Sequence, residues 1–388
     1  MTTEQFEGRQ TPFYYYDLAL LRRTLDAINE AKADCPNYCV HYAVKACAAP
    51  EILNEIAKAG LGADCVSGGE VLRAAENGFS ASDIVFAGVG KADWEIEAAL
   101  DLGISMFNVE SLPELEVINE LAVARGKVAR VAFRINPNVD GHTHAKITTG
   151  LVENKFGIAM EDMIFAIRRA ETLSNVEFVG LHFHIGSQIT EMSPFAALCS
   201  RINELTAQLE GEGIHVKSIN VGGGLGVDYQ HPDTCPIPDF KAYFDTFRTH
   251  LRLADDQELH FELGRAVVAQ CGALVTRVLY VKEGHQKSFV IVDAGMTDLI
   301  RPALYDAYHQ ADNLTAAEDT KRQATANDAQ QTYDVVGPIC ESSDVFLRDY
   351  QMPLTRRGDL IVFRTAGAYG EIMASQYNCR RLPGRMVE

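Results

Sequence analysis

The hydrophobic and polar positions follow a repeating pattern from residue 38 to residue 263. Short apolar runs rich in β-forming residues recur, and each is followed by a glycine or polar turn and then by a segment with apolar positions at helical spacing. This alternation is typical of parallel strands joined by crossover helices. The predicted strands are YCVHYAVK (38–45), GADCV (62–66), DIVFAG (83–88), ISMFNV (104–109), VARVAFRIN (128–136), EFVGLHFHIG (177–186), VKSINVGGG (216–224) and ELHFELG (258–264).

Eight such strand-helix units favour an α/β fold, a closed (β/α)8 TIM barrel, over an open doubly wound sheet. In a barrel of this kind the C-terminal ends of the strands meet at one face, where the chemistry takes place. Ionisable residues and glycines gather at these ends, which core packing alone does not explain. They are Lys45, Asp64, Arg134, His182, His184, Gly222, Gly223, Gly224 and Glu262.

The pattern changes after residue 265 to longer strands without regular helices, which predicts a β-sandwich or barrel-like domain. The early segment TPFYYYD also resembles a strand, and we expect it to pair with that domain. The expected organisation is an N-terminal segment (1–30), a barrel (31–265) and a C-terminal β domain (266–388). Residues 310–331 are polar and are expected to form an exposed loop or hairpin.

Composition and charge narrow the class of protein. The chain is 47% hydrophobic and 23% charged, without an 18-residue apolar run, which indicates a soluble folded protein and no membrane partner. The net charge of −18, with no basic run longer than a pair, argues against nucleic acid as a partner. The start MTTEQFEGRQ has no signal-peptide pattern and the nine cysteines include no CxxC pair, so we expect a reducing cytoplasm.

Lys45 stands at the end of an apolar run, where two interpretations are open. A lysine at a strand end is often a solvated residue that begins a loop. A lysine in a barrel mouth has its pKa lowered by desolvation and can form a Schiff base with a carbonyl compound. Position alone does not separate these alternatives.

The segment INVGGGLGVDY follows the seventh predicted strand. Three successive glycines let backbone amides approach a phosphate, as loops after strands seven and eight of barrels do, whereas the alternative is a flexible turn. The segment lacks GxxxxGK[ST] and fits GxGxxG poorly, which weighs against nucleotide and dinucleotide binding.

The segments HFHIGSQ and FELGR supply the remaining polar groups. His182 and His184 share a strand face, but no matching ligands stand out, so no metal site is expected. His184 could instead pack on a planar cofactor, with Ser187 donating to a phosphate. Glu262 either pairs with Arg265 or holds a protonated ring nitrogen. A lysine, a phosphate loop and such an acid together describe pyridoxal 5′-phosphate.

HYAVKA, HIGSQ, GGGLG and FELGR resemble the cofactor motifs of the fold-type III pyridoxal-phosphate-dependent decarboxylases, over almost the whole chain. The resemblance implies an alanine-racemase-like barrel in which Lys45 bonds the cofactor and Glu262 contacts its pyridine nitrogen. It also implies contacts of the cofactor ring with His184 and of its phosphate with Ser187. The other cofactor residues that it implies are Asp64, Arg134, Gly222, Gly223, Gly224, Gly264, Arg265 and Tyr369.

The segments DAGMTDLIRPALYDAYH and GPICESSDVF resemble the family's substrate-binding motifs. They imply that Cys340 is the proton donor and that the substrate is bound by Arg265, Arg301, Tyr305, Glu341 and Tyr369. CESSD with RPALYDAYH resembles the branch that decarboxylates meso-2,6-diaminopimelate to L-lysine and CO2, the last step of lysine biosynthesis. The family's head-to-tail dimers imply a homodimer here, with Cys340 and Glu341 reaching the neighbouring subunit's cofactor.

One position departs from the family motif, because Leu263 stands where the family usually has proline. We expect a local change of the turn there, with cofactor binding retained. Related decarboxylases that act on carboxynorspermidine, ornithine or arginine share the cofactor motifs and are the alternative functions. An inactive regulatory paralogue should lack Lys45 or Cys340, and a Schiff-base aldolase should lack the C-terminal β domain.

Overall fold

The computed structural model describes residues 1–139, 155–319 and 330–388. They form two compact units, which we call the barrel unit (Arg23–Gly226 and Pro238–Val267) and the sheet unit (Met1–Arg22, Val227–Ile237 and Val268–Glu388).

This division differs from the expected ranges at residues 23–30, 227–237 and 266–267. Helix α1 (Leu18–Ala31) is continuous across the first boundary, so it contributes residues to both units. Residues 227–237 belong with the sheet unit because Tyr229 accepts a hydrogen bond from Arg301 of that unit.

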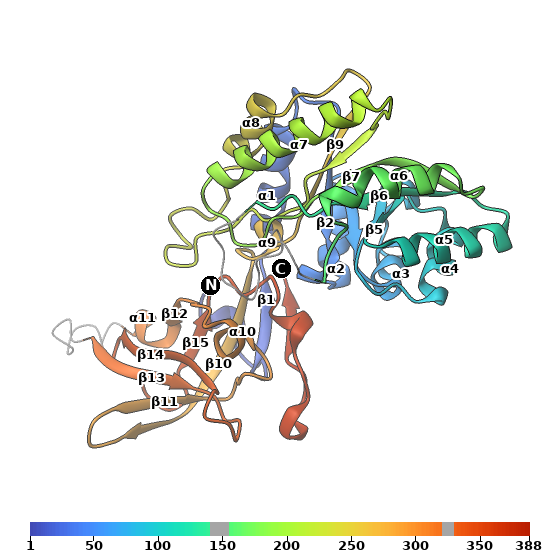
Figure 1. Cartoon of the computed structure of the whole chain (residues 1–388). Coiled ribbons are helices and arrows are strands. Elements are labelled where there is room, and N and C mark those ends of the chain that lie inside the picture. Colours follow the sequence, from blue (N-terminus) through green and yellow to red (C-terminus); the bar gives the residue numbers. More distant parts are fainter. Residues whose placement is uncertain (140–154, 320–329) are drawn as a thin grey trace. The chain divides into compact units, whose positions relative to one another are not determined.

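The barrel unit contains a closed barrel of parallel strands in the order β2-β3-β4-β5-β6-β7-β8-β9 (Figure 1), which confirms the predicted fold. Each strand falls on one of the predicted apolar runs. Their bounds are β2 Tyr38–Ala43, β3 Gly62–Cys65, β4 Ile84–Phe86, β5 Met106–Val109, β6 Ala129–Arg134, β7 Val176–His182, β8 Ser218–Asn220 and β9 Glu258–Leu263.

Helices alternate with these strands, as the sequence pattern predicts. Serine side chains cap two of them, since Ser67 accepts a hydrogen bond from the Glu70 amide and Ser111 from the Glu114 amide. The helices are α2 Pro50–Lys58, α3 Gly68–Glu76, α4 Asp93–Leu102, α5 Leu112–Arg125, α6 Met163–Glu171, α7 Ser193–Gly211, α8 Phe240–His250 and the short α9 Arg265–Val268.

Alternation along β9 decides which of its side chains face the barrel interior. Phe261 packs on Phe244 and Phe247 of α8, with ring centroids 4.9 and 5.1 Å apart, so its side of the strand faces the helices. Because strand side chains alternate, Glu258, His260 and Glu262 all face the interior. One face of β9 thus carries polar groups from one end of the barrel to the other.

The sheet unit is a mostly antiparallel sheet of eight strands (Figure 1). The path β12-β15-β10-β11-β13-β14 is extended by β1, which pairs with both β10 and β16. The N-terminal strand therefore belongs to the β domain, as predicted. The bounds are β1 Phe13–Tyr16, β10 Gly272–Glu283, β11 Ser288–Val292, β12 Ala311–Asn313, β13 Gln331–Val336, β14 Val345–Met352, β15 Leu360–Phe363 and β16 Gly384–Val387.

The expectation of an exposed loop over residues 310–331 is wrong for the described part of that range. Strand β12 and helix α11 (Leu314–Glu318) lie in it, and Leu314 is buried in an apolar cluster with Phe13 and Val362. Residues 320–329 lie outside the described residues. A further helix of the sheet unit is α10 (Arg301–Tyr305). Among the described residues, no helix is long and apolar enough to cross a membrane.

Candidate active site

Lys45 lies in a single 3-10 turn, Val44–Ala46, directly after β2. Its Nζ is 3.0 Å from Oδ2 of Asp64, whose strand neighbour Ala43 is two residues before Lys45. Asp64 is fully buried, whereas the Lys45 side chain is 40% exposed. Burial raises the pKa of Asp64, and the nearby charge of Glu262 adds to this rise while Lys45 opposes it. The structure therefore brings these two predicted residues together with the amine accessible to a ligand.

Glu262 is held at the same end of the barrel by side chains from three other strands. Asn108 and Asn220 donate to its Oε1 at 3.1 and 2.8 Å, and Nε2 of His182 lies 3.1 Å from Oε2. Burial alone would raise the pKa of Glu262, but His182 and Lys45 outweigh it and hold the pKa well below its usual range. The carboxylate is therefore buried, oriented and ionised.

Asn108 and Asn220 are site residues that the sequence analysis missed. Asn108 is the polar member of the otherwise apolar strand MFNV, and this exception was an available signal, whereas Asn220 ends the short strand SIN and gives no such signal. Asn220 also accepts a hydrogen bond at 2.8 Å from the backbone amide of Gly222, so it links Glu262 to the glycine turn. Such contacts between strands cannot be predicted from the sequence pattern of one strand.

The glycine turn after β8 is packed so closely that no side chain fits. A Cβ on Gly222 would lie 2.3 Å from the Phe183 carbonyl, and one on Gly223 would lie 2.0 Å from the Glu262 carbonyl. Gly222 and Gly224 also have φ values of 68° and 113°, which favour glycine. The turn therefore requires glycine. The sequence alone did not exclude the alternative that these glycines form a flexible turn.

His184 and Arg265 flank this turn. The Gly223 amide donates to Nδ1 of His184 at 3.4 Å, and Nη2 of Arg265 donates to Oγ of Ser187 at 3.1 Å. Burial lowers the pKa of His184 to about 3, and the charges of Arg134 and Lys45 add to this effect, so the imidazole is neutral near pH 7.

Strand β9 ends at Leu263, the position that departs from the family motif. Leu263 is 1% exposed and is the register partner of Tyr42 in β2. Gly264 is buried and connects the strand to α9, which begins at Arg265.

Arg134 ends strand β6 and is held by Glu110, a third residue that the sequence analysis missed. Its Nη1 donates to Oε1 of Glu110 at 3.1 Å, and Glu110 also accepts the amides of Gly88 and Gly157 at 3.1 Å each. The guanidinium carbon lies 4.6 Å from the ring centroid of Phe156. Arg134 is thus fixed at the C-terminal end of the barrel.

In the sheet unit, Arg301 begins α10 and is 7% exposed. Its Nη2 donates to the hydroxyl of Tyr229 at 3.3 Å, and its Nε to Nε2 of His309 at 3.4 Å. Nδ1 of His309 faces the Arg364 carbonyl at 3.0 Å and must carry the hydrogen, since a carbonyl only accepts. Tyr305 lies close by, with its centroid 5.9 Å from the guanidinium carbon of Arg301.

Cys340 and Glu341 are both exposed, in the turn between β13 and β14. The Cys340 amide donates to Oδ1 of Asn378 at 3.1 Å, and the Tyr377 hydroxyl donates to Oε1 of Glu341 at 2.6 Å. This hydrogen bond raises the pKa of Tyr377. The segment around Tyr377 therefore supports the turn, a role that no sequence motif indicated.

Tyr369 is partly buried and has a φ of 56°, in the left-handed region that non-glycine residues seldom adopt. The next residue must be small, because a Cβ on Gly370 would lie 2.4 Å from the Ala366 carbonyl. The backbone therefore fixes the direction of this predicted site residue.

Comparison with known proteins gives the family. A family profile described as "Pyridoxal-dependent decarboxylase, pyridoxal binding domain" matches residues 21–269. The chain belongs to the pyridoxal-dependent decarboxylase family. The match spans the barrel strands together with Lys45, the glycine turn and Glu262.

Members of this family resemble the chain over nearly its whole length. A diaminopimelate decarboxylase of Bacteroides thetaiotaomicron is 61% identical over 98% of this chain and 96% of its own length. One of Neisseria meningitidis is 43% identical over 96% of this chain and 88% of its own. The crystal structure of the Helicobacter pylori diaminopimelate decarboxylase with L-lysine matches with a TM-score of 0.91 and 39% identity, covering 100% of this chain and 93% of that one.

Proposed function

We propose that this chain is an enzyme that uses pyridoxal 5′-phosphate to decarboxylate meso-2,6-diaminopimelate, giving L-lysine and CO2. The observation that carries the proposal is the meeting of Lys45 with Asp64 and the ionised Glu262 at one end of the barrel. The choice of substrate is supported by full-length relatives named diaminopimelate decarboxylase and by relatives crystallised with L-lysine.

The residues at this end of the barrel fit the cofactor. Among the described residues, Asp64 Oδ1, Asn108 Oδ1 and His182 Nδ1 are buried polar atoms without a hydrogen-bond partner, which leaves capacity for a polar ligand. The glycine turn excludes side chains and can therefore offer backbone amides to a phosphate. When bound, the cofactor supplies an electron sink for the electron pair left by the departing carboxylate.

The barrel residues hold and orient that cofactor. Lys45 is the attachment point, and Glu262 would accept a hydrogen bond from the pyridine nitrogen because His182 and Lys45 keep its carboxylate ionised. The neutral His184 ring would contact the cofactor ring. The phosphate is bound at the glycine turn by Gly222, Gly223, Gly224, Ser187, Gly264 and Arg265, with Asp64, Arg134 and Tyr369 completing the cofactor site.

The sheet-unit residues act on the substrate. Cys340 holds a proton at Sγ and delivers it to the carbon that has lost CO2. The distal end of the substrate is bound by Glu341 through its amino group and by Arg301 through its carboxylate. Tyr229 and His309 orient the Arg301 guanidinium, which favours a bidentate carboxylate pair. Tyr305, Arg265 and Tyr369 line the same substrate site.

The proposal includes a homodimer with shared active sites. Cys340 and Glu341 are exposed in the single chain, which suits residues that work beside another subunit's cofactor. A catalytic thiol in open water would have no means of excluding side reactions, so a second surface should cover it.

We also place the protein in the cytoplasm, in lysine biosynthesis. None of its nine cysteines, all of which are described, forms a disulfide, which suits a reducing compartment. The pathway follows from the proposed product.

A substrate comparison tests the reaction. The purified protein, loaded with pyridoxal phosphate, is supplied with meso-diaminopimelate, ornithine, arginine or carboxynorspermidine, and released CO2 is measured. We expect release from meso-diaminopimelate. If CO2 were released only from another amino acid, the proposed substrate would be wrong and the proposed cofactor site would stand. If CO2 were released from none of them, the protein would be an inactive relative of the decarboxylases.

The substitution Arg301→Ala tests how the distal carboxylate is recognised. Loss of a charge-assisted bidentate pair should lower kcat/KM for meso-diaminopimelate by about 10²-fold, because such hydrogen bonds contribute roughly 1.5–3 kcal/mol each. The absorbance of the bound cofactor should stay unchanged. Arg348→Ala, at an exposed arginine of β14, is the matched control. An equal loss in both variants, or none in Arg301→Ala, would contradict the assignment.

A further inference from the structure

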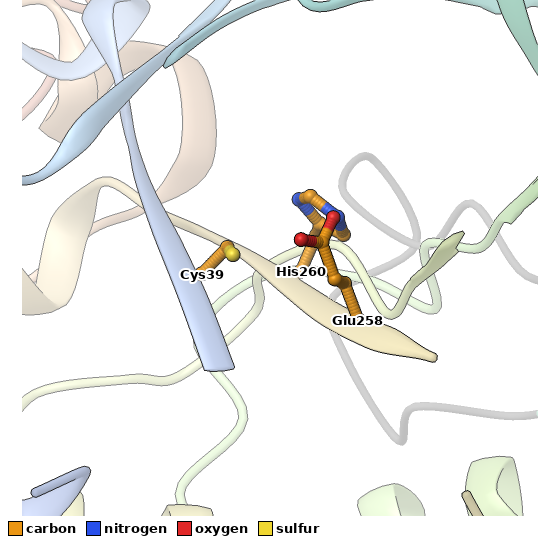
Figure 2. Close-up of side chains that lie close together, drawn as sticks. All are labelled: Cys39, Glu258 and His260. Carbon is orange, nitrogen blue, oxygen red and sulfur yellow. The ribbon is translucent and has the colours of Figure 1, made fainter. Parts of the chain in front are cut away.

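A cluster of potential metal ligands lies inside the barrel at the end opposite to Lys45. Cys39 is near the start of β2, and Glu258 and His260 are at the start of β9 (Figure 2). One ligand atom from each, a thiol sulfur, a carboxylate oxygen and an imidazole nitrogen, lies within 4.8 Å of the other two. Cys39 and His260 are register partners in the strand pair that closes the barrel.

The hydrogen bonds behind His260 determine which of its nitrogens carries a proton. Nδ1 of His41 lies 3.0 Å from the Asp83 carbonyl, and its Nε2 lies 2.9 Å from Nδ1 of His260. A carbonyl only accepts, so Nδ1 of His41 is the protonated nitrogen. In the neutral ring its Nε2 then accepts a hydrogen bond from Nδ1 of His260.

These hydrogen bonds leave Nε2, the other nitrogen of a neutral His260, with an unshared electron pair that a metal ion can accept. Nε2 of His260 is buried and has no hydrogen-bond partner in the described part of the chain. It faces the carboxylate of Glu258 at 3.5 Å. A histidine whose second nitrogen is bound in this way has the tautomer and ring orientation typical of a metal ligand.

The backbone makes room for these hydrogen bonds. A Cβ on Gly62 would lie 2.3 Å from the Asp83 carbonyl and 2.4 Å from Nδ1 of His41. Only glycine at this position of β3 allows the ring of His41 to reach that carbonyl. The orientation of His260 is therefore fixed by a neighbouring strand, not by the cluster itself.

We propose that Cys39, Glu258 and His260 bind a zinc ion that links the first and last strands of the barrel. Sulfur, nitrogen and carboxylate oxygen are the ligands that zinc prefers, and three of them leave a fourth position for water. Ligands at about 2.0–2.3 Å from a tetrahedral zinc are about 3.3–3.8 Å apart. Glu258 Oε2 and His260 Nε2 are 3.5 Å apart, which already matches this spacing, so any contraction on zinc binding brings the Cys39 thiol toward them.

The ion would act on the stability of the barrel. Two of its ligands, Glu258 and His260, lie on the interior face of β9 that also carries Glu262, but at the other end of the strand, and the third, Cys39, lies on β2. Binding displaces the thiol proton of Cys39 to solvent and stabilises the folded state by mass action. The expectation of no metal site concerned His182 and His184, and the sequence gives no signal for this cluster because its ligands come from opposite ends of the barrel sequence and match no spacing motif.

The test measures zinc directly on the cofactor-loaded protein. The protein is stripped with a chelator, freed of unbound pyridoxal phosphate and equilibrated with Zn²⁺, and bound zinc is determined by atomic emission. We expect about one zinc per chain and a melting temperature several degrees above that of the stripped protein. Co²⁺ should produce a thiolate charge-transfer absorbance.

Variants separate the site from other thiols. Cys39→Ser should abolish the cobalt-thiolate absorbance and lower zinc affinity at least about tenfold, whereas Cys35→Ser, at a cysteine outside the cluster, should retain both. Glu258→Gln changes an exposed side chain, so it should fold normally and also lose zinc affinity. Stoichiometric zinc in Cys39→Ser and Glu258→Gln, or none in the unsubstituted protein, would overturn the proposal.

Discussion

Two carboxylates of the candidate site, Glu262 in the barrel unit and Glu341 in the sheet unit, are held in opposite ways. Glu262 is 7% exposed and is contacted by side chains from three other strands. Glu341 is exposed, and the hydrogen bond that the structure gives its carboxylate comes from Tyr377. The carboxylate proposed to contact the cofactor is therefore enclosed within one barrel, whereas the carboxylate proposed to bind the substrate's amino group is open to solvent.

Electrostatics explains why the two arrangements differ. A buried charge costs several kcal/mol unless neighbouring groups compensate it, so Glu262 needs a complete set of partners in every molecule. An exposed carboxylate is solvated and needs none until water is excluded. Glu341 can therefore remain ionised in water until a substrate or a second subunit contacts it.

The largest effect should come from Lys45→Ala. Removing the amine that is proposed to attach the cofactor should lower CO2 release by at least about 10⁴-fold, the upper end of what a single proton-transfer group contributes. Absorbance of cofactor retained after desalting provides a second measurement, and it should fall as well. Lys58→Ala, at an exposed lysine paired with Glu55, is the control. Turnover within tenfold of normal would disprove the role of Lys45.

Glu262→Gln should have the next largest effect. The amide keeps the shape but removes the charge, so the rate should fall by about 10²–10³-fold, as when a preorganised electrostatic partner is lost. The fold should persist, and cofactor absorbance should change in position. Glu177→Gln, at an exposed carboxylate of β7, controls for the substitution itself. If both variants kept the full rate, the buried carboxylate would have no part in the reaction.

Asn220→Ala tests how the low pKa of Glu262 is maintained. Losing one donor to the ionised carboxylate costs about 1.5–3 kcal/mol, which corresponds to a pKa rise of about one to two units. The pKa of Glu262 in the folded protein lies below its unfolded value of 4.5. The ionised carboxylate therefore stabilises the fold at pH values above 4.5. This stabilisation is lost as the pH falls through the folded pKa.

The raised pKa in Asn220→Ala should therefore move acid unfolding to higher pH. Circular dichroism across an acid titration measures the midpoint, with Asn203→Ala, at a half-buried asparagine of α7 outside the Glu262 contacts, as control. An unchanged midpoint would show that His182 and Lys45 alone keep Glu262 ionised.

The sequence predicted the barrel well because each strand and each crossover helix carries its own local periodicity. Lys45, Glu262 and the glycine turn stand at strand ends, where topology alone brings them to one face. Asn108, Asn220 and Glu110 were missed because their importance depends on contacts between strands distant in sequence. Leu314 was placed in a polar loop since one buried leucine gives no periodic signal.

The smallest effect should come from Tyr377→Phe, which removes the hydroxyl that contacts Glu341. Because this hydrogen bond is exposed, KM for meso-diaminopimelate should rise by only about twofold to tenfold, with kcat nearly unchanged. Tyr280→Phe, at an exposed tyrosine of β10, is the matched control. A loss as large as that of Glu262→Gln would mean that Glu341 is already buried and dependent on Tyr377 in the working enzyme, as a second subunit covering the turn would make it. The size of the KM change in Tyr377→Phe therefore measures how exposed Glu341 remains to solvent once the enzyme has assembled.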